Sequence, residues 1–125
     1  MAEVIDYEFK RGDTKVLRKF RPTDNNGQPL NLNSTDQIYF TMKKDENGKA
    51  IIKKSINNGI YLEDDGYYHI TMEADDTSEL VADTYKYDIE MNLNLEKRFA
   101  RTLIEGEITL LQDITSKEDR IWMKM

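Results

Sequence analysis

The residues of this chain that could do chemistry are one histidine, several acidic clusters and a group of tyrosines. His69 is the only histidine, and a zinc site or a general acid-base pair would need further partners held in fixed geometry. The local pattern places His69 on the outward side of a strand, and nothing supplies a second nitrogen ligand. We therefore interpret His69 as a solvent-facing or cross-strand-paired residue, and we predict no catalytic residue and no cofactor.

Acidic residues gather at Glu63-Asp64-Asp65, Asp75-Asp76 and Asp83. Loop carboxylates can bind calcium, and two carboxylates about 5 to 10 Å apart can hydrolyse a glycosidic bond. The spacing does not match an EF-hand loop, and turns and helix N-caps use the same residue types. We assign no metal ligand, and calcium binding stays an open alternative. A hydrolase that uses these acids is a further functional hypothesis, ranked third after the two described below.

Exposed tyrosines could stack on sugar rings through their flat apolar faces. Among the tyrosines in the middle and second half of the chain, Tyr68, Tyr85 and Tyr87 fall on predicted core faces. This leaves Tyr61 and Tyr67 as candidate glycan contacts. The second functional hypothesis is therefore a carbohydrate-binding module.

Two other segments could recognise proteins. The triplet Arg11-Gly12-Asp13 would suggest receptor adhesion in an extracellular protein, but a turn between two strands explains it more simply. The C-terminal segment carries the only tryptophan, and Ile121, Trp122 and Met123 are candidate partner contacts because exposed aromatic residues mark interfaces. The alternative is that these three side chains fold back onto the domain.

Composition limits the remaining classes of function. The 125 residues suffice for one domain, which we place at residues 1–115 with a C-terminal tail at 116–125. Because there is no cysteine, disulfides and thiolate metal sites are excluded. A net charge of −6 argues against nucleic-acid binding, and no run approaches the roughly 20 apolar residues that span a bilayer. We expect a soluble protein made in the cytosol, without a membrane anchor.

Alternating apolar and polar residues identify the elements that would position these side chains. The run from Tyr85 to Glu96 alternates strictly, which is typical of a long β-strand with one buried face. Shorter runs predict strands at 4–9, 14–21, 37–43, 50–52, 60–62, 67–73 and 99–111. The Lys53-Lys54 end of the fourth strand is expected to face water. A short helical turn is predicted near residues 75–80, where acids and a hydroxyl suit an N-cap.

Two irregular positions leave alternatives open. Val16 and Phe20 share a face with Arg18, which a bulge, an edge position or an arginine whose methylenes cover the core would each explain. Gly106 interrupts an apolar face and marks a bulge or a close crossing. Strands at this spacing without a long helix predict an all-β fold. The specific expectation is an antiparallel immunoglobulin-like β-sandwich of about seven to eight strands, whose short helical turn bridges the two sheets.

Several short segments follow one another in an order that matches a known family. They are Gly12-Asp13-Thr14, Asp24 to Gly27 with Pro29 and Leu30, Ile38-Tyr39-Phe40-Thr41, Gly66-Tyr67-Tyr68, Asp76-Thr77 with Leu80, Tyr85-Lys86-Tyr87-Asp88-Ile89, Arg101-Thr102-Leu103-Ile104-Glu105-Gly106 and Asp113-Ile114-Thr115. This succession spans nearly the whole chain. It resembles the N-terminal domain of phage baseplate upper proteins.

The resemblance implies a β-sandwich component of a Gram-positive phage or prophage tail, which attaches to the distal tail or baseplate and carries receptor-binding proteins through later segments. This sequence departs from the pattern by stopping at Met125 without a coiled-coil linker, and by having Ala82-Asp83 where the family has a small residue and glycine. We expect a non-enzymatic virion component, made in the bacterial cytoplasm, that binds other tail or baseplate proteins and could form a homo-oligomer. An unpaired edge strand or the Trp122 segment is the expected contact.

Overall fold

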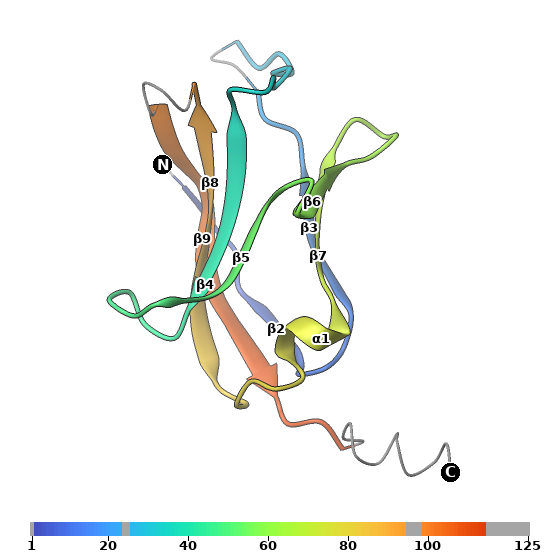
Figure 1. The fold of residues 1–125 in the computed structure, drawn as a ribbon, viewed down its shortest axis with the longest axis vertical. Helices are drawn as coiled ribbons and strands as arrows, with labels where there is room; N and C mark the ends of the chain where they lie inside the picture. Colours follow the sequence, from blue (N-terminus) through green and yellow to red (C-terminus); the bar gives the residue numbers. More distant parts are fainter. Residues whose placement is uncertain (1, 24–25, 95–98, 115–125) are drawn as a thin grey trace.

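The computed structural model describes residues 2–23, 26–94 and 99–114. Strands make up most of its regular structure, as the alternation predicts (Figure 1). They are β1 (Glu3–Val4), β2 (Tyr7–Lys10), β3 (Lys15–Phe20), β4 (Gln37–Lys43), β5 (Ala50–Ile56), β6 (Gly59–Leu62), β7 (Tyr68–Met72), β8 (Thr84–Leu93) and β9 (Phe99–Leu111). One helical turn, α1 (Ala74–Thr77), follows β7.

All nine strands belong to one mixed sheet, in the order β1-β9-β8-β4-β5-β6-β7-β3, with β2 also paired to β9. The strands β1 and β2 run parallel to β9, and β5 runs parallel to β6; the other pairs are antiparallel. The sheet curls into a half-barrel (Figure 1). The all-β prediction is confirmed, but the strands form one curled mixed sheet where two antiparallel sheets were expected.

The curl creates two limbs that face each other. We call β9, β8 and β4 the long-strand limb and β6, β7 and β3 the short-strand limb; β5 connects them (Figure 1). The connection is small, since the β5–β6 ladder contains two residue pairs, Ser55 with Gly59 and Ile56 with Ile60. Between these pairs the chain turns through Asn57, whose φ of 67° lies in the left-handed region.

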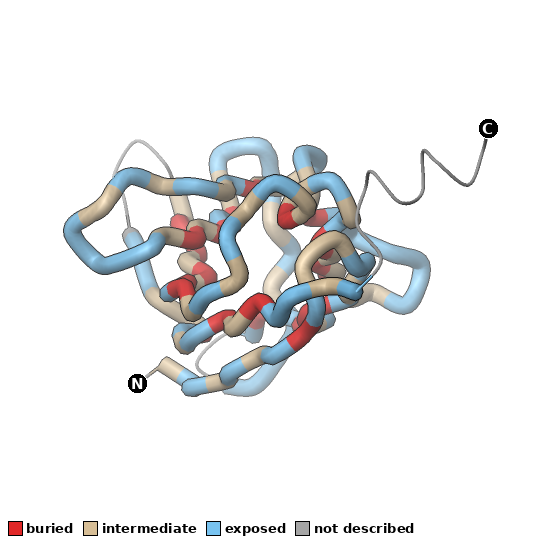
Figure 2. The backbone as a smooth tube through the Cα atoms, turned by 90° about the horizontal axis from the view of Figure 1, so that it is seen from below, coloured by how far each residue is buried: buried red, intermediate tan, exposed pale blue. Residues whose placement is uncertain are grey.

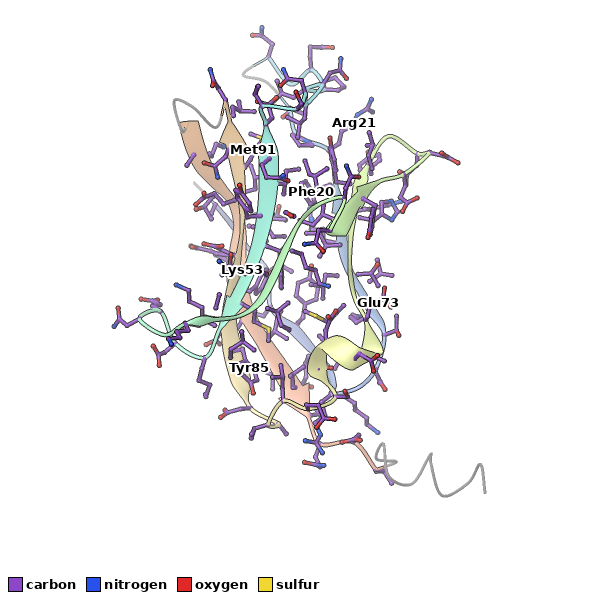
Figure 3. All side chains as sticks on the ribbon, viewed as in Figure 1. Phe20, Arg21, Lys53, Glu73, Tyr85 and Met91 are labelled. Atoms are coloured by element: carbon purple, nitrogen blue, oxygen red, sulfur yellow. The ribbon has the colours of Figure 1, made fainter. Side chains whose placement is uncertain are left out.

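Apolar side chains from both limbs fill the space between them (Figure 3). Buried and exposed positions alternate along the strands (Figure 2), as expected for strands with one face on a core. The most completely buried side chains include Ile38, Phe40, Met42, Ile60, Ile70, Met72, Ile89, Ile108 and Leu110. The buried face predicted for the long strand from Tyr85 and the core positions predicted for Tyr68, Tyr85 and Tyr87 are therefore confirmed.

The structure resolves both irregular positions. The register shifts between Val16 and Arg18, so β3 contains a β-bulge, and β3 is also the last strand of the sheet. Val16 consequently faces solvent, with 57% of its surface exposed. Gly106 lies under a close crossing, because a Cβ there would be 2.1 Å from the carbonyl oxygen of Ile5. Each outcome is among the alternatives that the sequence leaves open.

The prediction for the end of β5 is wrong at Lys54. Strand β5 continues to Ile56, and its inward alternation buries Lys54 while Lys53 stays exposed. The Lys54 Nζ donates to Asp76 Oδ2 at 2.8 Å, so the buried ammonium has a carboxylate partner. Lysine is seldom buried unless it is paired, and the partner comes from the helical turn α1, which sequence alternation does not connect to β5.

The base of the half-barrel is fastened by the turn between β2 and β3. The amide of Gly12 donates to the buried Thr77 hydroxyl oxygen at 2.7 Å. Arg11 donates from Nε to Asp113 Oδ1 at 2.7 Å and from Nη1 to the Leu80 carbonyl at 3.0 Å. The Arg11-Gly12-Asp13 triplet is thus a structural turn, as predicted. It connects α1 and Leu80 to Asp113, which follows β9.

Candidate functional site

The open edge of the half-barrel offers backbone groups for pairing. Strand β3 ends the sheet and pairs with β7 on one side. Within the described ranges, no strand pairs with its other side. We call this free side of Lys15–Phe20 the β3 edge, and the boundary between it and β1–β2, which no backbone ladder of the described residues closes, the seam. Backbone N–H and C=O groups along such an edge can accept another strand.

The β3 edge is basic although the chain as a whole is acidic. Lys15, Arg18, Lys19 and Arg21 lie within residues 15–21, a stretch without any acid. Lys15 forms no ion pair with any residue that the structure describes. Arg21, just beyond β3, lies over an aromatic ring. We call these four side chains the basic edge cluster.

Arg18 lies at the inner rim of the seam. It is opposite Ile70, whose side chain points into the core, so Arg18 points the same way. Its Nη2 is 3.3 Å from the carboxylate of Glu3 on β1, across the seam. Its Nε is buried and has no hydrogen-bond partner among the described residues. Burial raises the pKa of the neighbouring Tyr7 and Tyr87 phenols, and the Arg18 charge offsets part of this increase.

The candidate glycan contacts share one outer face, over β6 and β7. Tyr61 lies directly opposite His69, and Tyr67 comes two residues before His69, so both rings point outward. Tyr61 is 49% exposed. Tyr67 is half-buried, and Lys19 Nζ and Arg21 Cζ lie 5.5 and 5.9 Å from its ring centre. The structure therefore brings the two tyrosines together but covers the Tyr67 ring with cations.

His69 pairs with one carboxylate on this face. Its Nε2 is 3.0 Å from Asp65 Oδ2, and its cross-strand neighbours are Lys19 and Tyr61. Asp65 also accepts a hydrogen bond from the Tyr67 amide, which lowers the pKa of Asp65, with His69 and Lys19 adding to the decrease. His69 lies on the outer face of β7, as the strand period predicts, and its side-chain partner Asp65 comes from the preceding turn, not from a neighbouring strand.

The acidic clusters do not converge. Asp65 lies in the β6–β7 turn and Asp76 in α1, at opposite ends of β7 (Figure 1). Asp76 is paired with Lys54, and Asp83 Oδ2 lies 3.0 Å from Lys44 Nζ. Among the described side chains, no three acidic or histidine residues gather as metal ligands.

A broad depression of about 1060 Å³ covers the outer face of β4, β5, β8 and β9. Its lining includes Lys43, Lys53, Lys86, Asp88, Glu90 and Glu105. Asp88 lies directly opposite Glu105; burial, then the charges of Glu90 and Glu105, raise the pKa of Asp88. Small-molecule pockets are lined mainly by apolar and aromatic side chains, whereas this surface carries many charged ones.

Other predicted positions lie outside the described residues. They are the candidate partner contacts Ile121, Trp122 and Met123 with the rest of the tail from residue 115, the loop positions 24–25 and the reversal at 96–98. In the described ranges, the single helix has four residues, and none is long and apolar enough to cross a membrane.

The basic edge cluster was not among the residues that sequence patterns indicated. A usable signal is present, since four cations and no acid occur within residues 15–21 of a chain with a net charge of −6. The edge position itself is set by pairing of β3 with β7, a long-range contact that the local pattern does not reveal.

No known family model and no curated protein matches this sequence. The resemblance to phage baseplate upper proteins therefore stays a prediction, and fold and side-chain geometry must support any functional assignment.

Proposed function

We propose that this chain is a non-enzymatic structural module of a phage or prophage tail or baseplate, made in the bacterial cytoplasm, which binds neighbouring virion proteins. The observation on which this proposal depends is the free β3 edge. Strand addition to such an edge is a common way for one protein to bind another. The two facing limbs would act as the two layers of an immunoglobulin-like sandwich, which stays part of the proposal.

Two further features support a protein-binding role. The charged depression on the outer face of the long-strand limb provides a second broad surface. The His69–Asp65 pair lies on an exposed outer face, whereas catalytic acid-base pairs are usually desolvated to shift their pKa values. The order of sequence motifs that resembles baseplate upper proteins points to virion proteins as the partners.

The test is co-expression with the proteins encoded by neighbouring genes, followed by purification of the complex. We expect a tail or baseplate protein to co-purify through gel filtration. The double variant Lys15→Glu/Lys19→Glu should lose it, and Lys49→Glu, an exposed change on the β4–β5 hairpin, should retain it. Neighbouring genes for glycan degradation, or no complex with any tail protein, would contradict the proposal.

A carbohydrate-binding module is the second candidate, favoured by the shared outer face of Tyr61 and Tyr67. Titration with bacterial cell-wall polysaccharide would test it. Saturable binding should be lost in Tyr61→Ala, whose ring is open, and retained in Tyr39→Ala, an exposed tyrosine on β4. Absence of saturable binding by the unmodified protein would remove this candidate.

A further inference from the structure

We propose that the β3 edge binds an extended acidic segment of a neighbouring protein, which joins the half-barrel as an additional strand in the seam. This inference rests on the proposed function, because it names the chemistry of the partner at the same edge. Its support comes from the backbone, the charges and the guanidinium of Arg18.

The backbone of β3 is prepared for strand addition. Its six residues are already extended and are held from one side by five residue pairs with β7. The other side faces the seam and has no strand partner among the described residues. A segment that matches this length would extend over about 20 Å. The bulge between Val16 and Arg18 interrupts the regular spacing of the backbone groups of β3, so a partner strand must accommodate it.

The charges of β3 select an acidic occupant. Lys15 and Arg18 are opposite the inward residues Met72 and Ile70, whereas Lys19 is opposite the outward His69. Cations therefore flank the edge on both faces of the sheet. Because side chains of a strand alternate between the faces, a paired segment with acidic residues would meet a cation on either side. Opposite charges across neighbouring strands stabilise pairing, and like charges oppose it.

The contact between Arg18 and Glu3 shows the recognition chemistry within the chain itself. Glu3 belongs to the opposite side of the seam, and its carboxylate reaches Arg18 Nη2 at 3.3 Å. Both side chains are partly exposed, and Arg18 Nε is buried without a hydrogen-bond partner among the described residues. A carboxylate that binds a guanidinium through two parallel hydrogen bonds would use such an N–H group. Arg18 Nε is therefore an unsatisfied donor that solvent does not reach in this arrangement, and a partner carboxylate would bind it after the Arg18 side chain reorients.

A second copy of this chain fits the seam less well. Two β3 edges side by side would set like charges against each other. The acidic β1–β2 edge of another copy is attached to β9 and the rest of its sheet. The turn at residues 11–14 joins β2 to β3 at one end of the seam. A lone extended segment can enter it more easily than a sheet.

The test uses a fluorescent ten-residue peptide in which valine and glutamate alternate, and a counterpart with lysine in place of glutamate. Fluorescence anisotropy with the full chain should show saturable binding of the glutamate peptide, at least tenfold tighter than the lysine peptide and weaker in salt. Lys15→Gln and Arg18→Gln should each weaken it about two- to fivefold. Lys49→Gln is the matched control and should leave binding unchanged.

Backbone pairing is tested by methylating alternate amide nitrogens of the glutamate peptide. In a paired strand, every second amide N–H points toward β3, and methylation of these nitrogens should abolish binding. Methylation of the other set of nitrogens should be tolerated better, because their N–H groups point away from β3. Hydrogen exchange of the full chain should slow at Lys15–Phe20 when the peptide is present.

Several results would overturn the inference. They are equal binding of both peptides, equal tolerance of both methylation registers, or no binding at millimolar peptide. Self-association that rises with concentration and weakens in Lys15→Gln would assign the edge to a second copy. If the peptide fails while tail proteins still co-purify, only the inference is wrong; if the peptide binds but no tail protein does, only the proposed function is wrong.

Discussion

The two limbs of the half-barrel are held by different kinds of interaction. In the long-strand limb, β8 forms ten residue pairs with β9 and seven with β4. In the short-strand limb, β7 forms five pairs with β3 and three with β6, and the connection to β5 contains two pairs. Side-chain contacts fasten this limb at its base, through Lys54 with Asp76 and Gly12 with Thr77.

The long-strand limb is stabilised by its hydrogen-bond ladders, whereas the short-strand limb depends on a few polar side-chain contacts. A long ladder distributes its free energy over many hydrogen bonds, each with a modest net contribution. A buried ion pair concentrates its effect in two side chains, so the loss of one partner is costly. We therefore expect the short-strand limb to be sensitive to single polar substitutions, and the long-strand limb to be sensitive mainly to a steric clash.

The largest effect is expected from Gly106→Ala, in the long-strand limb. The new Cβ would lie 2.1 Å from the Ile5 carbonyl oxygen, so the N-terminal segment must move away from β9. We expect a loss of about 3 kcal/mol in the free energy of unfolding, measured by chemical denaturation. Gly48→Ala, in the β4–β5 turn without such a clash, should change it by less than about 0.5 kcal/mol. Equal stability of the two variants would contradict the close crossing.

Asp76→Ala tests the fastening of the short-strand limb. It leaves the Lys54 ammonium buried without its carboxylate, and we expect a loss of about 2 to 3 kcal/mol in the free energy of unfolding. Lys54→Met, which removes the buried charge and keeps an apolar stem, should cost less than about 1 kcal/mol. Hydrogen exchange should accelerate more in β6 and β7 than in β8. Comparable acceleration in all three strands would show that the limbs are not separately fastened.

Thr77→Val sharpens the same comparison with a smaller change. Valine keeps the shape of the buried side chain but cannot accept the hydrogen bond from the Gly12 amide. We expect a loss of about 1 to 2 kcal/mol, from the unpaired amide. Thr41→Val, on the outer face of β4, is the matched control and should be nearly neutral in thermal unfolding. A stable Thr77→Val protein would mean that water can replace the hydroxyl.

Asp88→Asn should stabilise the long-strand limb slightly. The pKa of Asp88 is raised above 3.8 by burial and by Glu90 and Glu105. The folded state thus holds this proton more tightly than the unfolded state, and stability falls as pH rises from 3.8 through the folded-state value. We expect a gain below about 1 kcal/mol at neutral pH, which disappears below pH 3.8. Chemical denaturation of both proteins at neutral pH and below pH 3.8 would check this gain. A gain that persists at acidic pH would contradict an origin in the Asp88 charge.

Sequence alternation predicts the strands well where a single face is buried. Residues of β4 and β8 such as Phe40 and Ile89 are buried as their period requires, because a one-residue shift would expose the whole apolar set. The overall architecture was predicted less well. Parallel pairing of β2 with β9 joins segments about 100 residues apart, whose contact depends on the closure of the whole sheet, and no local pattern encodes it.

In the candidate site too, local strand period predicts some positions, and the arrangement of the whole sheet determines others. The outward positions of Tyr61 and His69 follow from strand period, whereas the free side of β3 follows from its place in the sheet. Lys54 was predicted in water because lysine is usually exposed; its burial depends on Asp76, which approaches from α1. Polar residues whose partners come from another element are where local prediction failed.

The parallel pairing of β2 with β9 has a consequence during synthesis. The amide of Glu107 donates to the Asp6 carboxylate across 101 positions of sequence, so β1 and β2 cannot form their described pairs until β9 leaves the ribosome. At about 5 to 20 residues per second, the newly made β1 and β2 wait several seconds or longer. A nascent chain released early would expose β2 without a neighbouring strand, and chaperones that bind extended segments would bind β2.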